Sequence, residues 1–370
     1  MGVAVADAIE GPYRDAGIIL KSGMRGEPSE DGGTYDAAIH PNVVDPDVFF
    51  DQDGKLWMVY GSYSGGIFIL GMDPATGKPF PGQGYGKKLV GGNHSRIEGP
   101  YMLYSPETAY YYLFLSFGGL DAAGGYNLRV VRSKRPDGPF VDAEGHEMTG
   151  VRADPSLPLF DDRSIEPFGA KLMGSHLWND PAGEGREFGY VSPGHNSAIY
   201  DEEADRYLLF FHTRFPGQGE RHNVRVHQMF LNTDGWPVVA PFRYAGERAG
   251  AADAERIPGD YELVDHGKDI SADVKRSASV RLEPDGGIGG AARGVWEADA
   301  DGRIRLTIDG VAYDGVWLRA WDSGAEAFTE TFTVLSPQGV ALWGARRPAP
   351  TPAPSAAAAH DAAPKGGGAS

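Results

Sequence analysis

The sequence NVVDPDVFFDQDGKLWMVYGSY, residues 42–63, decides the fold because its pattern recurs twice later in the chain. Asp45 precedes a short apolar stretch, a DQDG turn and the aromatic-rich stretch LWMVYGS. A second copy begins at Glu98 (IEGPYMLYSPETAYYYLFLS) and a third begins at His195 (HNSAIYDEEADRYLLFFHT). Each copy therefore reads as two strands joined by a turn, with a different ionisable residue at its start.

The three copies also agree in length. The separation is 17 residues from Asp45 to Ser62 and again 17 from His195 to His212, and the SPET turn makes the second copy one residue longer. Strand units repeated in this way are typical of radial architectures such as the β-propeller, in which the strand starts converge. The pattern predicts that Asp45, Glu98 and His195 meet at one end of a central channel.

Composition supports an all-β chain and narrows the choice of partners. The 53 glycines and 27 prolines fit many short strands joined by tight turns. The net charge of −17 disfavours nucleic acid and anionic membranes as partners. The chain has no cysteine, which excludes disulfides and thiolate metal sites. No stretch reaches the roughly 18 apolar residues of a membrane span, and no signal peptide is visible at the start of the chain.

The character of the sequence changes after the last repeat, which divides the chain into four parts. Residues 1–245 read as the propeller, and residues 246–259 form a charged linker rich in alanine and glycine. Residues 260–346 read as a second β domain with Asp-Gly hairpin turns. Residues 347–370 are a low-complexity tail of proline, alanine and glycine, for which we expect disorder.

Several residues near the strand starts could carry chemistry, and each also has a structural interpretation. Asp45 and Glu98 at equivalent points of adjacent repeats suggest the carboxyl pair of a glycosidase, although both also lie in turn-forming sequences. His195 is either a structural histidine or a single metal ligand beside the channel. Tyr63 could pack against a sugar ring or belong to the core, and Arg214 could bind a sugar hydroxyl or pair with a surface carboxylate.

These motifs together resemble glycoside hydrolase family 43. The resemblance is carried by VVDPDVFF, SRIEGPYM, GYVSPGHNSA and FHTRF, and it runs from about residue 3 to residue 344. It is strongest to the larger bacterial endo-α-1,5-L-arabinanases, which have an additional C-terminal β domain. The resemblance implies a five-bladed propeller followed by a small β-barrel-like domain, and secretion of the full-length protein.

The same resemblance assigns roles to the candidate residues. Glu98 matches the general acid, and Asp45 matches the acid that tunes the pKa of the general acid and orients it. His195 matches the histidine beside a channel metal, for which we expect Ca²⁺ coordinated largely by water. Independently of the resemblance, their chemistry and their positions near the strand starts lead us to expect that Tyr63 and Arg214 bind substrate.

The general base of the family is an aspartate of the first blade, and this chain has no counterpart. Counting back through the repeats places that aspartate about 30 or more residues before Met1. We therefore expect an N-terminally truncated chain whose first blade is largely missing.

The function that this resemblance implies is the hydrolysis of arabinan in plant cell walls by an inverting acid/base mechanism, impaired by the missing base. Two alternatives remain open. One is an exo-acting α-L-arabinofuranosidase or β-xylosidase, and the other is a non-catalytic carbohydrate-binding propeller remnant.

Overall fold

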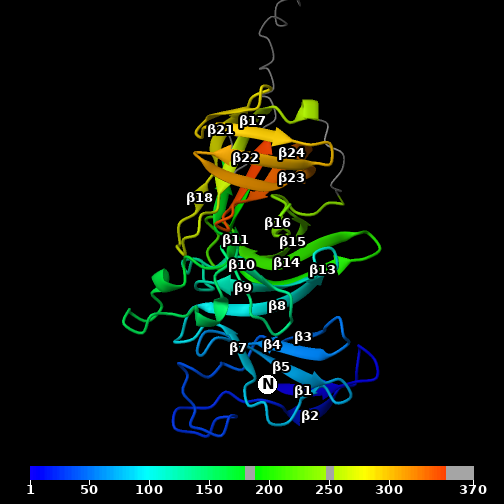
Figure 1. Cartoon of the computed structure of the whole chain (residues 1–370), viewed down its shortest axis with the longest axis vertical. Coiled ribbons are helices and arrows are strands. Elements are labelled where there is room, and N and C mark those ends of the chain that lie inside the picture. Colours follow the sequence, from blue (N-terminus) through cyan, green and yellow to red (C-terminus); the bar gives the residue numbers. More distant parts are fainter. Residues whose placement is uncertain (180–187, 247–253, 347–370) are drawn as a thin grey trace, which may run out of the picture.

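The computed structural model describes residues 1–179, 188–246 and 254–346, and these residues form almost only β-strands (Figure 1). The helices of the described part are three single turns of 3-10 helix: η1 (Met148–Gly150), η2 (Asp162–Ser164) and η3 (Ala254–Arg256). No helix within these ranges has the length and apolarity that spanning a bilayer requires. The predicted tail and residues 247–253 of the predicted linker lie outside the described residues. The all-β prediction is confirmed.

The first two-thirds of the chain form a series of sheets that follow one another along the long axis (Figure 1). A two-stranded sheet pairs β1 (Gly2–Val5) with β2 (Arg14–Ile18). The next sheet contains β3 (Asp47–Phe50), β4 (Leu56–Tyr60), β5 (Ile67–Asp73), β6 (Lys78–Pro79) and β7 (Lys87–Val90). A third sheet contains β8 (Ile97–Ser105), β9 (Tyr110–Phe117), β10 (Asn127–Ser133) and β11 (Ala170–Met173). The fourth contains β12 (His176–Trp178), β13 (Phe188–Asp201), β14 (Arg206–Arg214), β15 (His222–Leu231) and β16 (Pro237–Val239).

The three sequence repeats are the antiparallel hairpins β3–β4, β8–β9 and β13–β14. The first turn shows why the pattern folds in this way. The carboxylate of Asp51 accepts hydrogen bonds from the backbone N–H groups of Asp53 and Lys55, both at 2.9 Å, and from the Trp57 indole at 2.8 Å. An aspartate at this position therefore closes the turn and fixes the register of the hairpin.

The β8–β11 sheet is buried on both faces. Alternate residues of β9 belong to two different cores, with Tyr112 and Phe114 on one side and Leu113 and Leu115 on the other. Because side chains alternate along a strand, this sheet is packed between its two neighbours, with β8 against both β3 and β13. The described sheets do not confirm a five-bladed ring, and the propeller stays a prediction.

The C-terminal part is a closed barrel of eight strands, which confirms the expected β-barrel-like domain. Its strands, in order around the barrel, are β17 (Gly259–Asp265), β19 (Ala278–Leu282), β20 (Gly287–Gly290), β21 (Gly294–Ala298), β22 (Arg303–Ile308), β23 (Val311–Asp322), β24 (Ala327–Leu335) and β25 (Ala341–Arg346). A short strand, β18 (Lys275–Arg276), leaves the barrel and pairs in parallel with β12. Closure removes the sheet edges that would otherwise remain unpaired.

The barrel and the β12–β16 sheet share one hydrophobic core in which three histidines are enclosed. Trp343 of β25 lies in this core, and its ring centroid is 5.2 Å from that of His176 and 4.4 Å from that of His266. His227 accepts or donates a hydrogen bond at 2.9 Å with the hydroxyl of Tyr190. Burial lowers the pKa of His176 to about 4 and of His227 to about 3, and it also lowers the pKa of His266. The imidazoles are therefore neutral at neutral pH, as an apolar core requires.

Acidification should weaken this core. Between pH 6.5 and about 4 the unfolded histidines bind protons while the buried His176 and His227 do not, so the free energy of unfolding falls as the pH falls. The expected loss is about 1.4 kcal/mol per histidine for each pH unit in this window. Asp47, whose pKa burial raises to about 6, acts in the opposite direction but as a single group.

Thermal unfolding across this pH range checks the expectation. His176→Gln should flatten the dependence of Tm on pH. The exposed Gln52→Ala, which removes no ionisable group, is the control and should leave the dependence unchanged. An equal slope of Tm against pH in the original protein and both variants would contradict the assignment of the pH dependence to the buried histidines.

Candidate active site

Asp45 lies just before β3 in a backbone conformation that few residues adopt. Its φ is +55°, and the next residue is Pro46, which disfavours this region for the residue before it. The conformation aims the carboxylate at the third sheet, where Oδ2 accepts a hydrogen bond at 3.3 Å from the backbone N–H of Gly99. A strained residue at the start of a repeat is thus tied to the neighbouring repeat.

Glu98 is the second residue of β8, and hydroxyl groups hold its carboxylate at both oxygens. The hydroxyl of Ser62 donates to Oε2 at 2.9 Å, and the hydroxyl of Tyr126 donates to Oε1 at 2.6 Å. The β8–β9 register shifts between Glu98 and Tyr101, so a bulge sets the direction of this side chain. Ser62 and Tyr126 are buried while Glu98 is half-buried, so the carboxylate is fixed but accessible.

His195 reaches the same place from the third repeat. Its φ is +47°, and its backbone N–H donates to the hydroxyl of Ser116 at 2.7 Å. Its ring lies against Gly99, where a Cβ would fall 3.2 Å from Cγ of the imidazole. The prediction that His195 starts a strand is wrong, because β13 runs from Phe188 to Asp201 and a bulge places His195 in its middle.

The structure thus brings Asp45, Glu98 and His195 together around Gly99. Gly99 donates to Asp45, follows Glu98 in the chain and contacts the ring of His195. Its φ of +58° and the close approach of the imidazole both exclude a side chain. Convergence of the three repeats therefore depends on one glycine.

The two expected substrate-binding residues lie nearby in different settings. The hydroxyl of Tyr63 donates to the carbonyl of Gly118 at 3.2 Å. Burial, followed by the charge of Glu98, raises the pKa of Tyr63 to about 12. Arg214, at the end of β14, pairs with Glu220 at 2.5 Å, and its buried Nη1 has no hydrogen-bond partner. Tyr63 thus remains beside the carboxylates, whereas much of Arg214 is engaged with the loop that contains Glu220.

Sequence reasoning missed the residues that support these groups. Ser62 and Ser116 close the first and second repeats, and each hydrogen-bonds the residue that opens the next repeat. Because the two serines occupy equivalent positions at the ends of their repeats, the sequence could have predicted a shared role for them. Tyr126 and His212, whose rings stack at a centroid distance of 5.9 Å, had no signal that would separate them from core aromatics.

The residues around His195 fit an ion that keeps most of its water. One imidazole is offered, and the next residue, Asn196, is 5% exposed with neither side-chain amide atom hydrogen-bonded. Such a donor set is too small to fill a Ca²⁺ shell without water. No thiolate is available for a softer metal.

A different group has the spacing of a possible metal site. The ligand atoms of Asp142, Glu144 and His146 lie within 4.8 Å of one another. Asp142 already accepts from the backbone N–H groups of Glu144 at 3.0 Å and His146 at 2.9 Å, and Glu144 lies 3.5 Å from the ammonium of Lys268. The carboxylates of this cluster are therefore already engaged with protein groups in a closed turn. The cluster was not predicted from the sequence.

Comparison with known proteins places the chain in a family. Residues 1–161 match glycosyl hydrolases family 43, and residues 241–344 match a C-terminal lipocalin-like domain found with that family. The extracellular endo-α-(1→5)-L-arabinanase 2 of Bacillus subtilis is 61% identical over 346 residues, which are 94% of this chain and 73% of that protein. The extracellular endo-α-(1→5)-L-arabinanase of Thermotoga petrophila is 51% identical over 353 residues, which are 94% of this chain and 74% of that protein.

Solved structures agree with the sequence matches. A family 43 glycoside hydrolase from Bacillus licheniformis superposes with a TM-score of 0.90 at 62% identity and covers 93% of this chain and 76% of that one. The protein is a glycoside hydrolase. It belongs to family 43. The expected N-terminal truncation is not borne out by these alignments, which take in 94% of the chain.

Substitution of Gly99 tests the convergence point. Gly99→Ala places a Cβ against the His195 ring in a left-handed conformation, so we expect a loss of about 2–4 kcal/mol and a lower Tm. Gly219 has the same φ of +58°, and no atom lies within 4 Å of the point that its Cβ would occupy, so Gly219→Ala should lose only about 1 kcal/mol. Equal losses in the two variants would contradict the packing described for Gly99.

Proposed function

We propose that this enzyme hydrolyses α-1,5-L-arabinofuranosidic bonds in arabinan, a plant cell-wall polysaccharide, by an inverting acid/base mechanism. The observation that carries the proposal is the half-buried Glu98 carboxylate held by Ser62 and Tyr126 where three repeats meet. The names of relatives 61% and 51% identical support arabinan as the substrate. Both are named extracellular, which supports action outside the cell.

In this proposal Glu98 is the general acid that gives its proton to the leaving glycosidic oxygen. Asp45 is the orienting acid, because its hydrogen bond to Gly99 fixes the backbone beside Glu98. Tyr63 lies at the edge of this cluster and is assigned to the sugar, and Arg214 is assigned to substrate through its unpartnered Nη1.

The general base is the weak part of the site. In an inverting glycosidase the base lies about 6.5–9.5 Å from the acid to leave room for the attacking water, so it would not hydrogen-bond Glu98 directly. Two further acids influence Tyr63, but Asp162 is held by Arg96 and Asp121 accepts from the N–H of its own turn at Ala123. We infer slow turnover by this chain, since general-base catalysis contributes roughly 10²–10⁴-fold.

Two structural expectations belong to the same proposal. We assign the sheets to a five-bladed propeller, with Asp45, Glu98 and His195 at its channel. We also assign a hydrated Ca²⁺ to His195, supported by the unpartnered amide of Asn196. When bound, the ion would supply positive charge at the end of the channel.

Glu98→Gln tests the assignment of the acid. Removal of the ionisable group should lower reducing-sugar release from linear arabinan by about 10²–10⁴-fold, because the leaving oxygen would no longer be protonated. Glu107, exposed at the opposite end of the same hairpin, provides the matched control, and Glu107→Gln should leave the rate unchanged. A Glu98→Gln variant as active as the original chain would refute the role.

Product analysis separates the alternatives. An endo mode gives a mixture of oligosaccharides from arabinan, whereas an exo-acting arabinofuranosidase or β-xylosidase releases small products from chain ends or aryl glycosides. Binding of arabinan without any Glu98-dependent release would identify a non-catalytic carbohydrate-binding protein. Either of the last two results would overturn the proposed endo-hydrolysis.

Calcium binding is tested by unfolding. Added Ca²⁺ should raise Tm by a few degrees, since a ligand that binds only the folded state stabilises it. His195→Ala should abolish this shift, and His146→Ala, in the second cluster, should preserve it. The reverse result would move the metal to Asp142, Glu144 and His146.

A further inference from the structure

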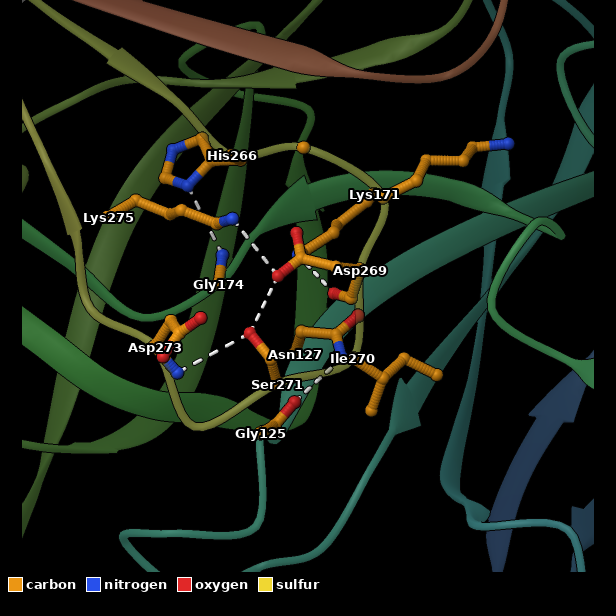
Figure 2. A network of polar contacts seen from close by, with 12 residues as sticks. Gly125, Asn127, Lys171, Gly174, His266, Asp269, Ile270, Ser271, Asp273 and Lys275 are labelled. Carbon is orange, nitrogen blue, oxygen red and sulfur yellow. Dashed lines mark hydrogen bonds and ion pairs between the residues drawn. The ribbon is translucent and has the colours of Figure 1, made fainter. Parts of the chain in front are cut away.

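Residues 266–277, here called the strap, leave the barrel between β17 and β19 and cross the sheets of the first part of the chain. The strap ends in β18, which pairs with β12, before the chain returns to the barrel. Figure 2 shows its central residues, Asp269, Ile270 and Ser271, lying between Lys171 on one side and Gly125 and Asn127 on the other. A direct connection between two antiparallel strands needs only a few residues, so the excursion requires an explanation.

Buried cations hold the backbone of the strap. Arg129, fully buried in β10, donates to the carbonyl of Lys268 at 2.6 Å. Lys171, 3% exposed in β11, donates to the carbonyl of Asp269 at 2.7 Å (Figure 2). Burial lowers the pKa of Arg129 to about 9 and of Lys171 to about 7. Two desolvated cations are a costly way to attach a loop, and they fix its path closely.

A carboxylate and an apolar side chain complete the attachment. The N–H of Ile270 donates to the carboxylate of Glu166 at 2.8 Å. The side chain of Ile270 packs against the core between the β3–β7 and β8–β11 sheets. The carboxylate of Asp269 accepts from Ser271 at 2.6 Å and from Lys275 at 3.0 Å, which holds the turn in shape (Figure 2).

The strap then touches the segment that carries Tyr126. A Cβ on Gly125 would lie 2.8 Å from three backbone atoms of Ser271, so the two backbones are in direct contact. On the other side of Tyr126, the side-chain amide of Asn127 donates to the carbonyls of Gly125 at 2.9 Å and Phe117 at 3.1 Å. Asn127 also accepts from Arg129 at 2.8 Å, the residue that holds the strap.

Tyr126 is the link to the reaction centre. Its side chain is fully buried, and its hydroxyl donates to Oε1 of Glu98 at 2.6 Å. Its ring also packs against Gly194, where a Cβ would fall 2.4 Å from it. A shift of the backbone at Gly125 would therefore move the hydroxyl relative to Glu98, because the ring has no free space in which to compensate.

We propose that the strap of the C-terminal barrel is a positioning element of the active site, acting through Gly125 to hold the Tyr126 hydroxyl on Glu98. The inference rests on the proposed role of Glu98 as general acid. It gives the barrel a part in the reaction, through a segment that leaves the barrel between two of its strands. The competing explanation is that the strap only fastens the barrel to the sheets.

Hydrogen exchange of the whole chain separates these explanations without needing activity. Gly125→Ala, which wedges the strap from the sheet side, and Ile270→Ala, which loosens it from its own side, should each raise amide exchange in residues 118–128 by at least about tenfold. Gly54→Ala is the matched control, since Gly54 has a φ of +76° against +70° for Gly125 and no neighbour within 4 Å. Faster exchange confined to barrel residues 259–282 would overturn the proposal.

A double-mutant cycle then tests the connection to Glu98. Ile270→Ala should lower kcat on linear arabinan about tenfold in the original chain, yet should have little further effect in a Tyr126→Phe background. Independent, multiplicative effects would overturn coupling through Tyr126. Absence of Glu98-dependent hydrolysis would instead refute the proposed function. In that case the hydrogen-exchange measurement would still decide whether the strap holds residues 118–128.

Discussion

The contact at Gly99 is the constraint on which the site depends. Its N–H donates a hydrogen bond to the Asp45 carboxylate, and the His195 ring occupies the space that a Cβ would need, so three separate repeats meet at one residue. Positive φ angles at Asp45, Gly99 and His195 show that the backbone is bent in all three repeats to reach this point. Such conformations persist only where the surrounding structure over-determines them, and here the packed β8–β11 sheet does so.

The repeats made much of this arrangement predictable. Three ionisable residues at equivalent positions indicated convergence, and turn residues such as Asp51 indicated hairpins. Tyr126 could not be predicted, because it lies outside the repeated pattern and an aromatic residue before a strand is usually part of the core. His195 was misplaced within its strand because the Pro-Gly pair before it reads as a turn, whereas β13 continues through this pair with bulges.

The strap and the barrel core were beyond sequence reasoning for a different reason. Their effects arise from contacts between residues about 140 positions apart, such as Arg129 with Lys268. The buried histidines are a related case. Each has ordinary strand neighbours in the sequence, and only the docking of Trp343 beside His176 and His266 makes them part of one apolar core. Local patterns predict elements, whereas packing between units decides the state of these side chains.

The serine hydroxyls described above limit how such a protein can evolve. Ser62 supports Glu98 and Ser116 supports His195, so each repeat completes the function of the one that follows it. Suppose that one repeat is exchanged for the same repeat of a relative. The new repeat would bring its own ionisable residue, but its serine would have to support the ionisable residue of a following repeat with which it did not evolve. Exchange of two adjacent repeats together should therefore be tolerated more readily than exchange of a single repeat. The pair that must be inherited together is the serine of one repeat and the ionisable residue of the next.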